Sequence, residues 1–407
     1  MTRSRRSGNY FRLLDDRGAI PSLDGLRGVA ILLVVVFHGI ESFAVDGPLL
    51  PLGRFDLAAP LYSGWMGVNL FFVLSGFLIT HHLLRRWEGH VSRADIGQYL
   101  LMRWIRIVPT YYIVLVIAAS GIIPFHTVQT EYLGWQVLYH LFFLQDYLPS
   151  GILGPFWSLG VEEKFYLIMP VALLIAWKLR NVRHQLVFLF AVAVLPLVIR
   201  LLAFPGAATA ADESFLRDWR NPFHLNLDGL FLGAACAWIF AKRSLLPGLR
   251  RSSVVPALAW SGCVLIAVLT IGQMLPGNRG FFHQVALYPL TAAAMAAILL
   301  ATLLRSTPGS RLLERRVLAG AGRIAYSWYL THVLVMHWLW GGLTASVPEL
   351  LALPATIQAF VFLPLYFAVS LFAALALHYT VEKPCLILKD RVASPRPGAV
   401  AVPAASA

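Results

Sequence analysis

The sequence contains few charged residues. Only 13% of its 407 residues are Asp, Glu, Lys or Arg, whereas 58% are hydrophobic and the mean hydropathy is +0.70. Soluble domains usually have about a quarter charged residues. The shortage of charge argues against an ordinary soluble protein and indicates that most of the chain lies in lipid.

The chain also lacks the patterns that mark several common sites. Its three cysteines, Cys236, Cys263 and Cys385, have no spacing typical of a disulfide framework or a metal site. The GxSxG, GxxxxGK[ST], HExxH and paired CxxC patterns are absent too. We therefore expect no bound metal.

A basic excess is present, with a formal net charge of +13, but it does not indicate nucleic acid. Lys and Arg lie in short clusters between apolar runs, which is typical of cytoplasmic loops under the positive-inside rule. The pattern predicts a multi-pass protein of the plasma or inner membrane.

Apolar stretches long enough to span a bilayer, about 17–25 residues each, recur along the chain. The candidates are 28–45, 66–84, 104–123, 156–177, 185–203, 223–241, 254–272, 285–304, 324–342 and 356–380. With these ten spans, 27 of the 33 Lys and Arg residues lie on the cytoplasmic side. Both termini are then cytoplasmic.

A further apolar stretch, 134–148, is short and contains His140 and Asp146. If it crossed the membrane, the basic cluster that follows at 178–183 would lie outside. We therefore predict an all-α polytopic transmembrane helix bundle of about ten spanning helices, plus one short re-entrant or interfacial helix at 134–148.

The chain divides into three parts. Residues 1–27 form a basic cytoplasmic segment, residues 28–384 form one transmembrane domain, and residues 385–407 form a cytoplasmic Pro/Ala-rich tail. The tail is expected to be disordered.

The first apolar stretch carries Arg27 and His38, which are 11 residues apart. This is almost three helical turns, so both side chains point to one face, about 16 Å apart along the axis. Asp24 and Glu41 extend the same stripe. An arginine suits phosphate groups, and a histidine near its pKa can take a hydroxyl proton. The alternative is a positive-inside anchor and a histidine that bridges helices.

The run FWSLGVEEKFYLIMP places Glu162, Glu163 and Lys164 inside a spanning helix. Ionisable groups at this depth usually mark a site or a pair. We choose Glu162 as the carboxylate that orients an imidazole or binds an acceptor hydroxyl, and the alternative is an internal Glu–Lys pair that packs helices. Ser75 is expected to be a small packing residue, and Gly76 to allow close helix approach.

Arg103 and Arg106, three residues apart before the third span, face the same way and form a basic mouth on the cytoplasmic side. This suits the phosphates of a donor. Contact with anionic lipid is the alternative for Arg106.

Four segments together resemble the acyltransferase-3 family of bacterial membrane O-acyltransferases. They are LDGLRGVAILLVVVFH (23–38), GVNLFFVLSGFLIT (67–80), FWSLGVEEKFYLIMP (156–170) and IAYSWYLTH (324–332), and YTVEKP (379–384) is similar to the closing motif of the family. The segments occur in order over nearly the whole chain. Lys164 departs from the pattern, since relatives often carry Gln or His there.

The resemblance implies transfer of an acyl group, usually acetyl, from acyl-CoA to a hydroxyl of a surface polysaccharide, a lipo-oligosaccharide or a macrolide. It implies His38, Arg27 and Glu162 as catalytic residues, and Arg27, Arg103 and Arg106 as donor-binding residues. Acyl-CoA is then a co-substrate and no cofactor is bound. Some relatives have an additional hydrolase-like domain outside the membrane, which leaves room for a separate extracytoplasmic partner protein.

Our hypothesis is therefore O-acylation of a carbohydrate-containing, polyhydroxylated acceptor, with His38 as general base and direct transfer favoured over an acyl-histidine intermediate. The residues expected to bind the acceptor or line the cavity are Asp24, Trp157, Ser158, Glu163, Asp228, Tyr326, Tyr329 and His332. The rival hypothesis is a transporter or flippase without covalent chemistry, and a third is a membrane sensor or scaffold.

Overall fold

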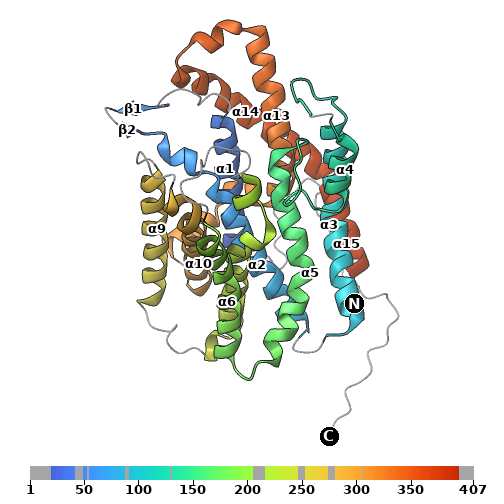
Figure 1. The fold of residues 1–407 in the computed structure, drawn as a ribbon, viewed down its shortest axis with the longest axis vertical. Coiled ribbons are helices and arrows are strands. Elements are labelled where there is room, and N and C mark those ends of the chain that lie inside the picture. Colours follow the sequence, from blue (N-terminus) through green and yellow to red (C-terminus); the bar gives the residue numbers. More distant parts are fainter. Residues whose placement is uncertain are drawn as a thin grey trace, which may run out of the picture.

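The computed structural model of the protein describes residues 20–41, 49–52, 55–87, 91–128, 131–204, 216–245, 253–273, 280–305 and 307–393. It is a bundle of helices (Figure 1). Strand structure in the described residues is confined to β1 (Pro51–Leu52) and β2 (Phe55–Asp56), a short antiparallel ribbon. The prediction of an all-α polytopic bundle is confirmed.

Each predicted span coincides with a helix. The long helices are α1 (Pro21–Glu41), α2 (Met66–Trp87), α3 (Arg93–Ala119), α5 (Trp157–Lys178), α6 (Val182–Leu202), α8 (Leu227–Ala241), α9 (Val254–Gln273), α10 (Leu287–Leu304), α13 (Ala325–Ser346) and α14 (Ala355–Leu377). Seven of the helical segments in the described residues are long and apolar enough to cross a membrane, and α5, α8 and α13 are not among them. That these three also cross stays a prediction.

Shorter elements connect the long helices. They are η1 (Ala59–Ser63), α4 (Leu133–Leu141), η2 (Gly154–Phe156), η3 (Leu216–Arg220), η4 (Phe223–Leu225), η5 (Arg243–Leu245), η7 (Phe282–Ala286), α11 (Pro308–Leu313), α12 (Arg316–Arg323), η8 (Pro348–Ala352), η9 (His378–Glu382) and α15 (Lys383–Ala393). With nine residues, α4 is about 14 Å long and too short to cross a bilayer core of about 30 Å. This agrees with the re-entrant or interfacial prediction for 134–148.

Two helices begin well before their predicted starts, and the predicted tail begins differently. The helix α3 begins at Arg93 rather than at 104. The helix α1 begins at Pro21 rather than at 28, because proline is well suited to the first turn and the polar residues that follow are covered by another helix. The predicted tail begins as α15, which packs against α3. The rest of that tail, 394–407, and most of the predicted basic segment, 1–19, lie outside the described residues.

The two ends of the bundle differ in charge. The turn from α5 to α6, at the bottom of Figure 1, carries Lys178, Arg180 and Arg183, and we call this the basic end. The opposite end carries β1, β2, α4 and the connection from α13 to α14. Since α1 leads into β1, it runs from the basic end toward the opposite end, with Arg27 in its second turn and His38 in its last.

Glycines let the central helices approach closely. A Cβ atom on Gly76 of α2 would lie 2.0 Å from the carbonyl oxygen of Leu230 on α8, and one on Gly233 would lie 2.1 Å from that of Val73. Small residues allow such backbone contact in membrane proteins. The predicted role of Gly76 is confirmed.

The first half of α1 packs against α12 in the same way. A Cβ atom on Gly28 would lie 2.1 Å from the carbonyl oxygen of Leu318, and one on Gly322 would lie 1.8 Å from that of Asp24. No side chain fits between the two backbones. This contact fixes the part of α1 that carries Arg27.

The α1–α12 contact can be tested with two alanine substitutions in one helix. Gly322→Ala forces the backbones apart and is expected to lower the free energy of unfolding by about 1–3 kcal/mol. Gly320→Ala is the matched control, because a Cβ there meets nothing within 4 Å and alanine favours the helix by up to about 1 kcal/mol. Denaturant unfolding of the purified protein in detergent measures both. Equal stability of the two variants would contradict the close contact.

Candidate functional site

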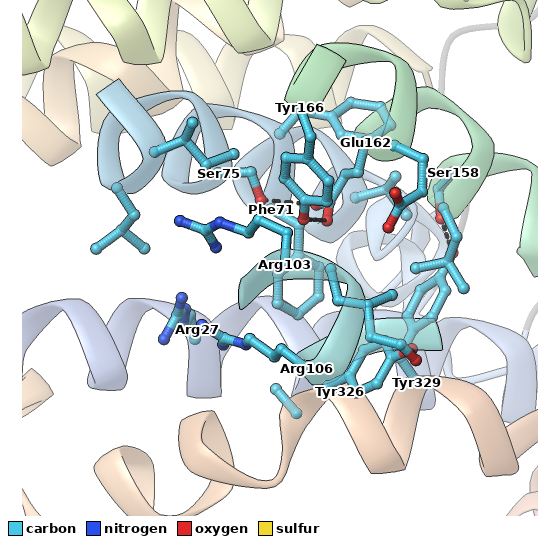
Figure 2. Close-up of a pocket in the computed structure, with 18 of the residues that line it drawn as sticks. Arg27, Phe71, Ser75, Arg103, Arg106, Ser158, Glu162, Tyr166, Tyr326 and Tyr329 are labelled. Atoms are coloured by element: carbon cyan, nitrogen blue, oxygen red, sulfur yellow. Dashed lines mark hydrogen bonds between the residues drawn. The ribbon is translucent and has the colours of Figure 1, made fainter. Parts of the chain in front are cut away.

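A cavity, partly open to solvent, lies between α1, α2, α3, α5, α12, α13 and η9, and about 960 Å³ of space in and at its mouth is not occupied by atoms. Phe71, Phe72 and other apolar side chains form much of its wall (Figure 2). Its polar lining residues are Arg27, Ser75, Arg103, Arg106, Ser158, Glu162, Glu163, Tyr166, Arg323, Tyr326, Tyr329 and Glu382. The cavity therefore combines an apolar body with several charged groups, as small-molecule sites do.

Three arginines converge at one side of the cavity. Figure 2 shows the guanidinium groups of Arg27, Arg103 and Arg106 gathered together, with Ser158 and Tyr329 at the other side. Arg103 and Arg106 make no ion pair with any described residue, and Arg103 lies 5.4 Å from the ring centre of Tyr166. Such a cluster of positive charge suits an anionic ligand with several charges.

Asp24 links α1 to α12 and is not among the residues that line the cavity, so its expected role in binding the acceptor stays a prediction. Its carboxylate lies 3.1 Å from Nε of Arg323 and 3.6 Å from Nη1 of Arg27. The shorter contact is with Arg323, which leaves Arg27 only loosely paired. The reason is the α12 contact, which covers the first turn of α1.

Glu162 accepts two hydrogen bonds inside the cavity. Oγ of Ser75 donates to Oε1 at 2.7 Å, and the hydroxyl of Tyr166 donates to Oε2 at 2.9 Å. Ser75 is thus a cavity residue, and its interpretation as packing alone is wrong. The expectation that Glu162 orients a histidine is not met by this geometry, since its partners are two hydroxyl groups.

Glu163 and Lys164 do not pair with each other. Nζ of Lys164 donates to Oδ1 of Asp146 at 2.5 Å and to the carbonyl oxygen of Phe143 at 2.5 Å. Asp146 has a fully buried side chain and also accepts from the backbone N–H of Phe223 at 3.2 Å. The alternative of an internal Glu–Lys pair is therefore wrong, and Lys164 instead holds the 142–146 segment against α5. Glu163 lines the cavity as predicted.

The deep side of the cavity carries hydroxyl groups. Ser158 Oγ and the hydroxyl of Tyr329 lie 2.6 Å apart, and Tyr329 also donates to the carbonyl oxygen of Pro155 at 2.8 Å. The hydroxyl of Tyr326 donates to the carbonyl oxygen of Ile107 at 2.8 Å. These three residues line the cavity as predicted.

His38 lies beyond Tyr329 and contacts His332 rather than the cavity. Nδ1 of His332 faces the carbonyl oxygens of Tyr329 and Trp328 at 2.8 and 3.2 Å, so it carries the proton and its Nε2 accepts. Nε2 of His332 lies 3.3 Å from Nδ1 of His38, and that Nδ1 also donates to the carbonyl oxygen of Val34 at 2.9 Å. The lone pair of His38 is therefore on Nε2. The carbonyl oxygen of Val34 and, at a longer distance, Nε2 of His332 favour this tautomer.

Asp228 is not among the residues that line the cavity, and its expected role in binding the acceptor stays a prediction. Its Oδ2 lies 3.6 Å from Nη1 of Arg200, and both side chains are almost completely buried. Arg200 also donates to the carbonyl oxygen of Leu225 at 3.0 Å and lies over the ring of Tyr288. A buried charge needs a partner, and Arg200 is the partner of Asp228.

Trp157 packs its ring against Phe72 and does not line the cavity, and its expected role in binding the acceptor stays a prediction. Glu382 lines the cavity, whereas the sequence analysis placed it only within the segment YTVEKP and did not predict it as a site residue. It accepts from Ser327 at 2.6 Å and contacts Nδ1 of His378 at 2.9 Å, within the π-helical turn η9. Such turns often occur at functional sites, a signal that the sequence alone does not give.

The described residues contain no group of three or more His, Cys, Asp or Glu side chains arranged to hold a metal ion. The candidate site consists of two parts. One is the cavity with its three arginines, and the other is the His38–His332 pair next to Tyr329.

A family model described as an acyltransferase domain matches residues 20–379 of the chain. The chain is 27% identical to the peptidoglycan O-acetyltransferase OatA of Listeria monocytogenes, over 78% of this chain and 49% of that protein. It is 26% identical to a Bacillus subtilis protein provisionally named as peptidoglycan O-acetyltransferase YrhL, over 78% and 48%. The chain therefore spans about half the length of the curated relatives it matches. No solved structure matches it.

The Lys164–Asp146 pair provides a test of how the site is supported. Lys164→Met leaves the buried carboxylate of Asp146 without its counter-charge, and we expect a loss of about 3–5 kcal/mol in the free energy of unfolding. Adding Asp146→Asn removes the unpaired charge and should recover more than half of that loss. Denaturant unfolding in detergent measures both variants. If Lys164→Met is as stable as the wild type, the Lys164–Asp146 pair does not hold the 142–146 segment against α5.

Proposed function

Because the chain belongs to the acyltransferase domain family, we propose that it transfers an acyl group, most simply acetyl, from acyl-CoA to a hydroxyl group of a carbohydrate-containing acceptor. The donor occupies the cavity and the acceptor approaches His38. The observation that carries this proposal is the cluster of Arg27, Arg103 and Arg106 at one side of the cavity.

The arginine cluster supports a donor that carries phosphates. Guanidinium groups bind phosphate oxygens in pairs of hydrogen bonds, and two of these three arginines have no carboxylate partner in the described structure. Acyl-CoA has several phosphate groups at one end and a thioester at the other. With the phosphates at Arg27, Arg103 and Arg106, its acyl arm extends along the apolar wall toward Ser158 and Tyr329.

His38 supplies the base in this proposal. Its Nε2 takes the proton of the acceptor hydroxyl while that oxygen forms a bond to the thioester carbonyl carbon. The carbon–sulfur bond then breaks, and the leaving thiolate takes a proton from the imidazole. The carbonyl oxygen of Val34 and the ring of His332 keep the His38 lone pair on Nε2, and Glu162 lies on the donor side with Ser75 and Tyr166.

The relatives support a carbohydrate acceptor, since two of them carry names as peptidoglycan O-acetyltransferases. We infer that the acceptor is a cell-wall or other surface polysaccharide and that it reaches His38 from outside. The basic end then faces the cytoplasm of a cell whose plasma membrane holds the bundle, with both termini inside. A separate extracytoplasmic partner protein would be compatible with this arrangement.

The proposal is tested by measuring the transfer of label from radiolabelled acetyl-CoA to cell-wall glycan. The purified wild-type protein is compared with two variants. Arg27→Ala should raise the KM for acetyl-CoA by about 10–100-fold, because a charge-assisted contact to phosphate is lost. His38→Ala should lower kcat by about 10²–10⁴-fold and leave the KM for acetyl-CoA unchanged, because only the proton transfer is lost.

Arg316→Ala is the matched control for Arg27→Ala, because Arg316 is an exposed arginine of α12 outside the cavity. Its kinetics should equal those of the wild type. If His38→Ala transfers label as fast as the wild type, His38 is not the general base. If the wild type neither binds nor consumes acetyl-CoA with any glycan fraction, the transporter or flippase hypothesis is favoured instead.

A further inference from the structure

A second arginine site lies near the other end of α1, where Arg220 ends the π-helical turn η3. Its guanidinium carbon lies 5.4 Å from the ring centre of Trp65 and 5.7 Å from that of Trp157. The side chain is partly exposed, and no carboxylate of the described residues forms an ion pair with it. Arg220 is therefore a positive charge held between two indole rings and accessible from outside the bundle.

The backbone that carries Arg220 is fixed. Nδ2 of Asn226 donates to the carbonyl oxygens of Arg220 and Pro222 at 2.7 and 2.9 Å. One residue earlier, the carbonyl oxygen of Trp219 accepts from Arg200 at 3.4 Å. Because this turn is already held in place, little conformational entropy is lost when a ligand binds to the Arg220 side chain.

The two rings that hold Arg220 are themselves braced. Trp65 packs edge-on against Tyr288, with ring centres 5.2 Å apart, and Trp157 packs against Phe72 at 5.8 Å. The guanidinium group is thus positioned by residues from α5 and from the segment before α2. Cation–π contacts of this kind orient an arginine without neutralising its charge.

Arg220 is connected to the proposed base through a short series of contacts. The ring of Trp157, 5.7 Å from its guanidinium carbon, precedes Ser158, whose Oγ lies 2.6 Å from the hydroxyl of Tyr329. The ring of Tyr329 lies 5.6 Å from that of His332, which in turn lies 4.9 Å from that of His38. Glu41 is within electrostatic reach but forms no ion pair with Arg220. His38 therefore has the donor arginines toward the basic end and Arg220 toward the opposite end.

A comparison with Arg200 shows what is unusual about Arg220. Arg200 is completely buried, lies beside Asp228 and donates to a backbone carbonyl, as expected of a structural arginine. Arg220 has the opposite set of features, namely partial exposure, aromatic neighbours and no carboxylate partner within the part of the chain that the structure describes. Those are the features of a guanidinium group that binds an external anion.

We propose that Arg220, held between Trp65 and Trp157, binds the anionic oxygen group of an acidic carbohydrate acceptor and so places one hydroxyl of that acceptor against His38. This inference rests on the proposed function and adds the class of acceptor to it. A carboxylate or a phosphate on the sugar provides the paired oxygens that a guanidinium group binds. The partly exposed ring of Trp157 offers apolar surface to the sugar ring beside the anion, whereas Trp65 is buried and supports Arg220 from within.

The test uses three acceptors with the same sugar backbone and saturating acetyl-CoA. They are N-acetylated chitotetraose, which is neutral, a tetrasaccharide of alternating N-acetylglucosamine and N-acetylmuramic acid, which carries carboxylates, and N-acetylated chitotetraose 1-phosphate. The wild type should show a lower KM for at least one anionic acceptor than for chitotetraose. The preferred one identifies whether carboxylate or phosphate is the group that is bound.

Arg220→Gln should raise the KM for the preferred anionic acceptor by about tenfold or more, since a charge-assisted contact is lost. The KM for chitotetraose and the KM for acetyl-CoA should change less than twofold. Arg220→Lys should recover part of the loss by restoring the charge without the paired hydrogen bonds. Arg316→Gln is the control and should behave as the wild type.

Two results would overturn the inference. One is a wild type with no preference for either anionic acceptor, and the other is an Arg220→Gln variant that weakens all three acceptors equally. If none of the three is acetylated, binding of the fluorescently labelled tetrasaccharides decides the matter. Equal binding of anionic and neutral sugars to the wild type, or unchanged binding to Arg220→Gln, rejects the anion site. If Arg220 is required for tighter binding of an anionic sugar but no acetyl group is transferred, the anion site stands and only the acyltransferase proposal is rejected.

Discussion

The close contact between α1 and α12 is the constraint on which the rest of the site depends. Glycines on both helices bring the backbones together, and Asp24 joins them again through Arg323. The helix α1 carries both Arg27, which faces the donor cavity, and His38, the proposed base. Its position relative to α3 and α13 therefore decides whether Arg27 meets the other arginines and His38 meets His332. A shift of α1 would displace Arg27 from the α3 arginines and His38 from His332 together.

The helix α1 carries the proposed donor-binding residue Arg27 and the proposed base His38 at different points along its length. About 16 Å of helix lies between Arg27, which faces a cavity suited to a phosphorylated donor, and His38, which lies beyond the deep side of that cavity. Tyr329 is the element between them, since it lines the cavity and its ring lies 5.6 Å from that of His332. A donor and an acceptor can therefore approach from opposite ends of the bundle and meet at one place.

Much of this arrangement could be predicted from the sequence, because apolar length and charge bias report on lipid and orientation directly. The spacing of Arg27 and His38 also follows from helical geometry alone. Pairing between distant helices could not be predicted in this way. The sequence offered Glu162 as the partner of an imidazole, whereas the structure places His332 there, and it offered Asp228 as a cavity residue, whereas Arg200 neutralises it. Which side chains pair depends on the rotation and crossing angles of the helices, and the hydropathy of the sequence does not determine these angles.

Equilibrium binding of CoA and of pantetheine to the purified wild-type protein tests the central claim most directly, since the two ligands share the thiol arm and differ in the phosphorylated nucleotide. If Arg27, Arg103 and Arg106 hold the phosphates, CoA should bind at least about tenfold more tightly than pantetheine. An Arg103→Ala, Arg106→Ala double variant should lose most of that difference while keeping its affinity for pantetheine. Equal affinities of the wild type for the two ligands would contradict the account.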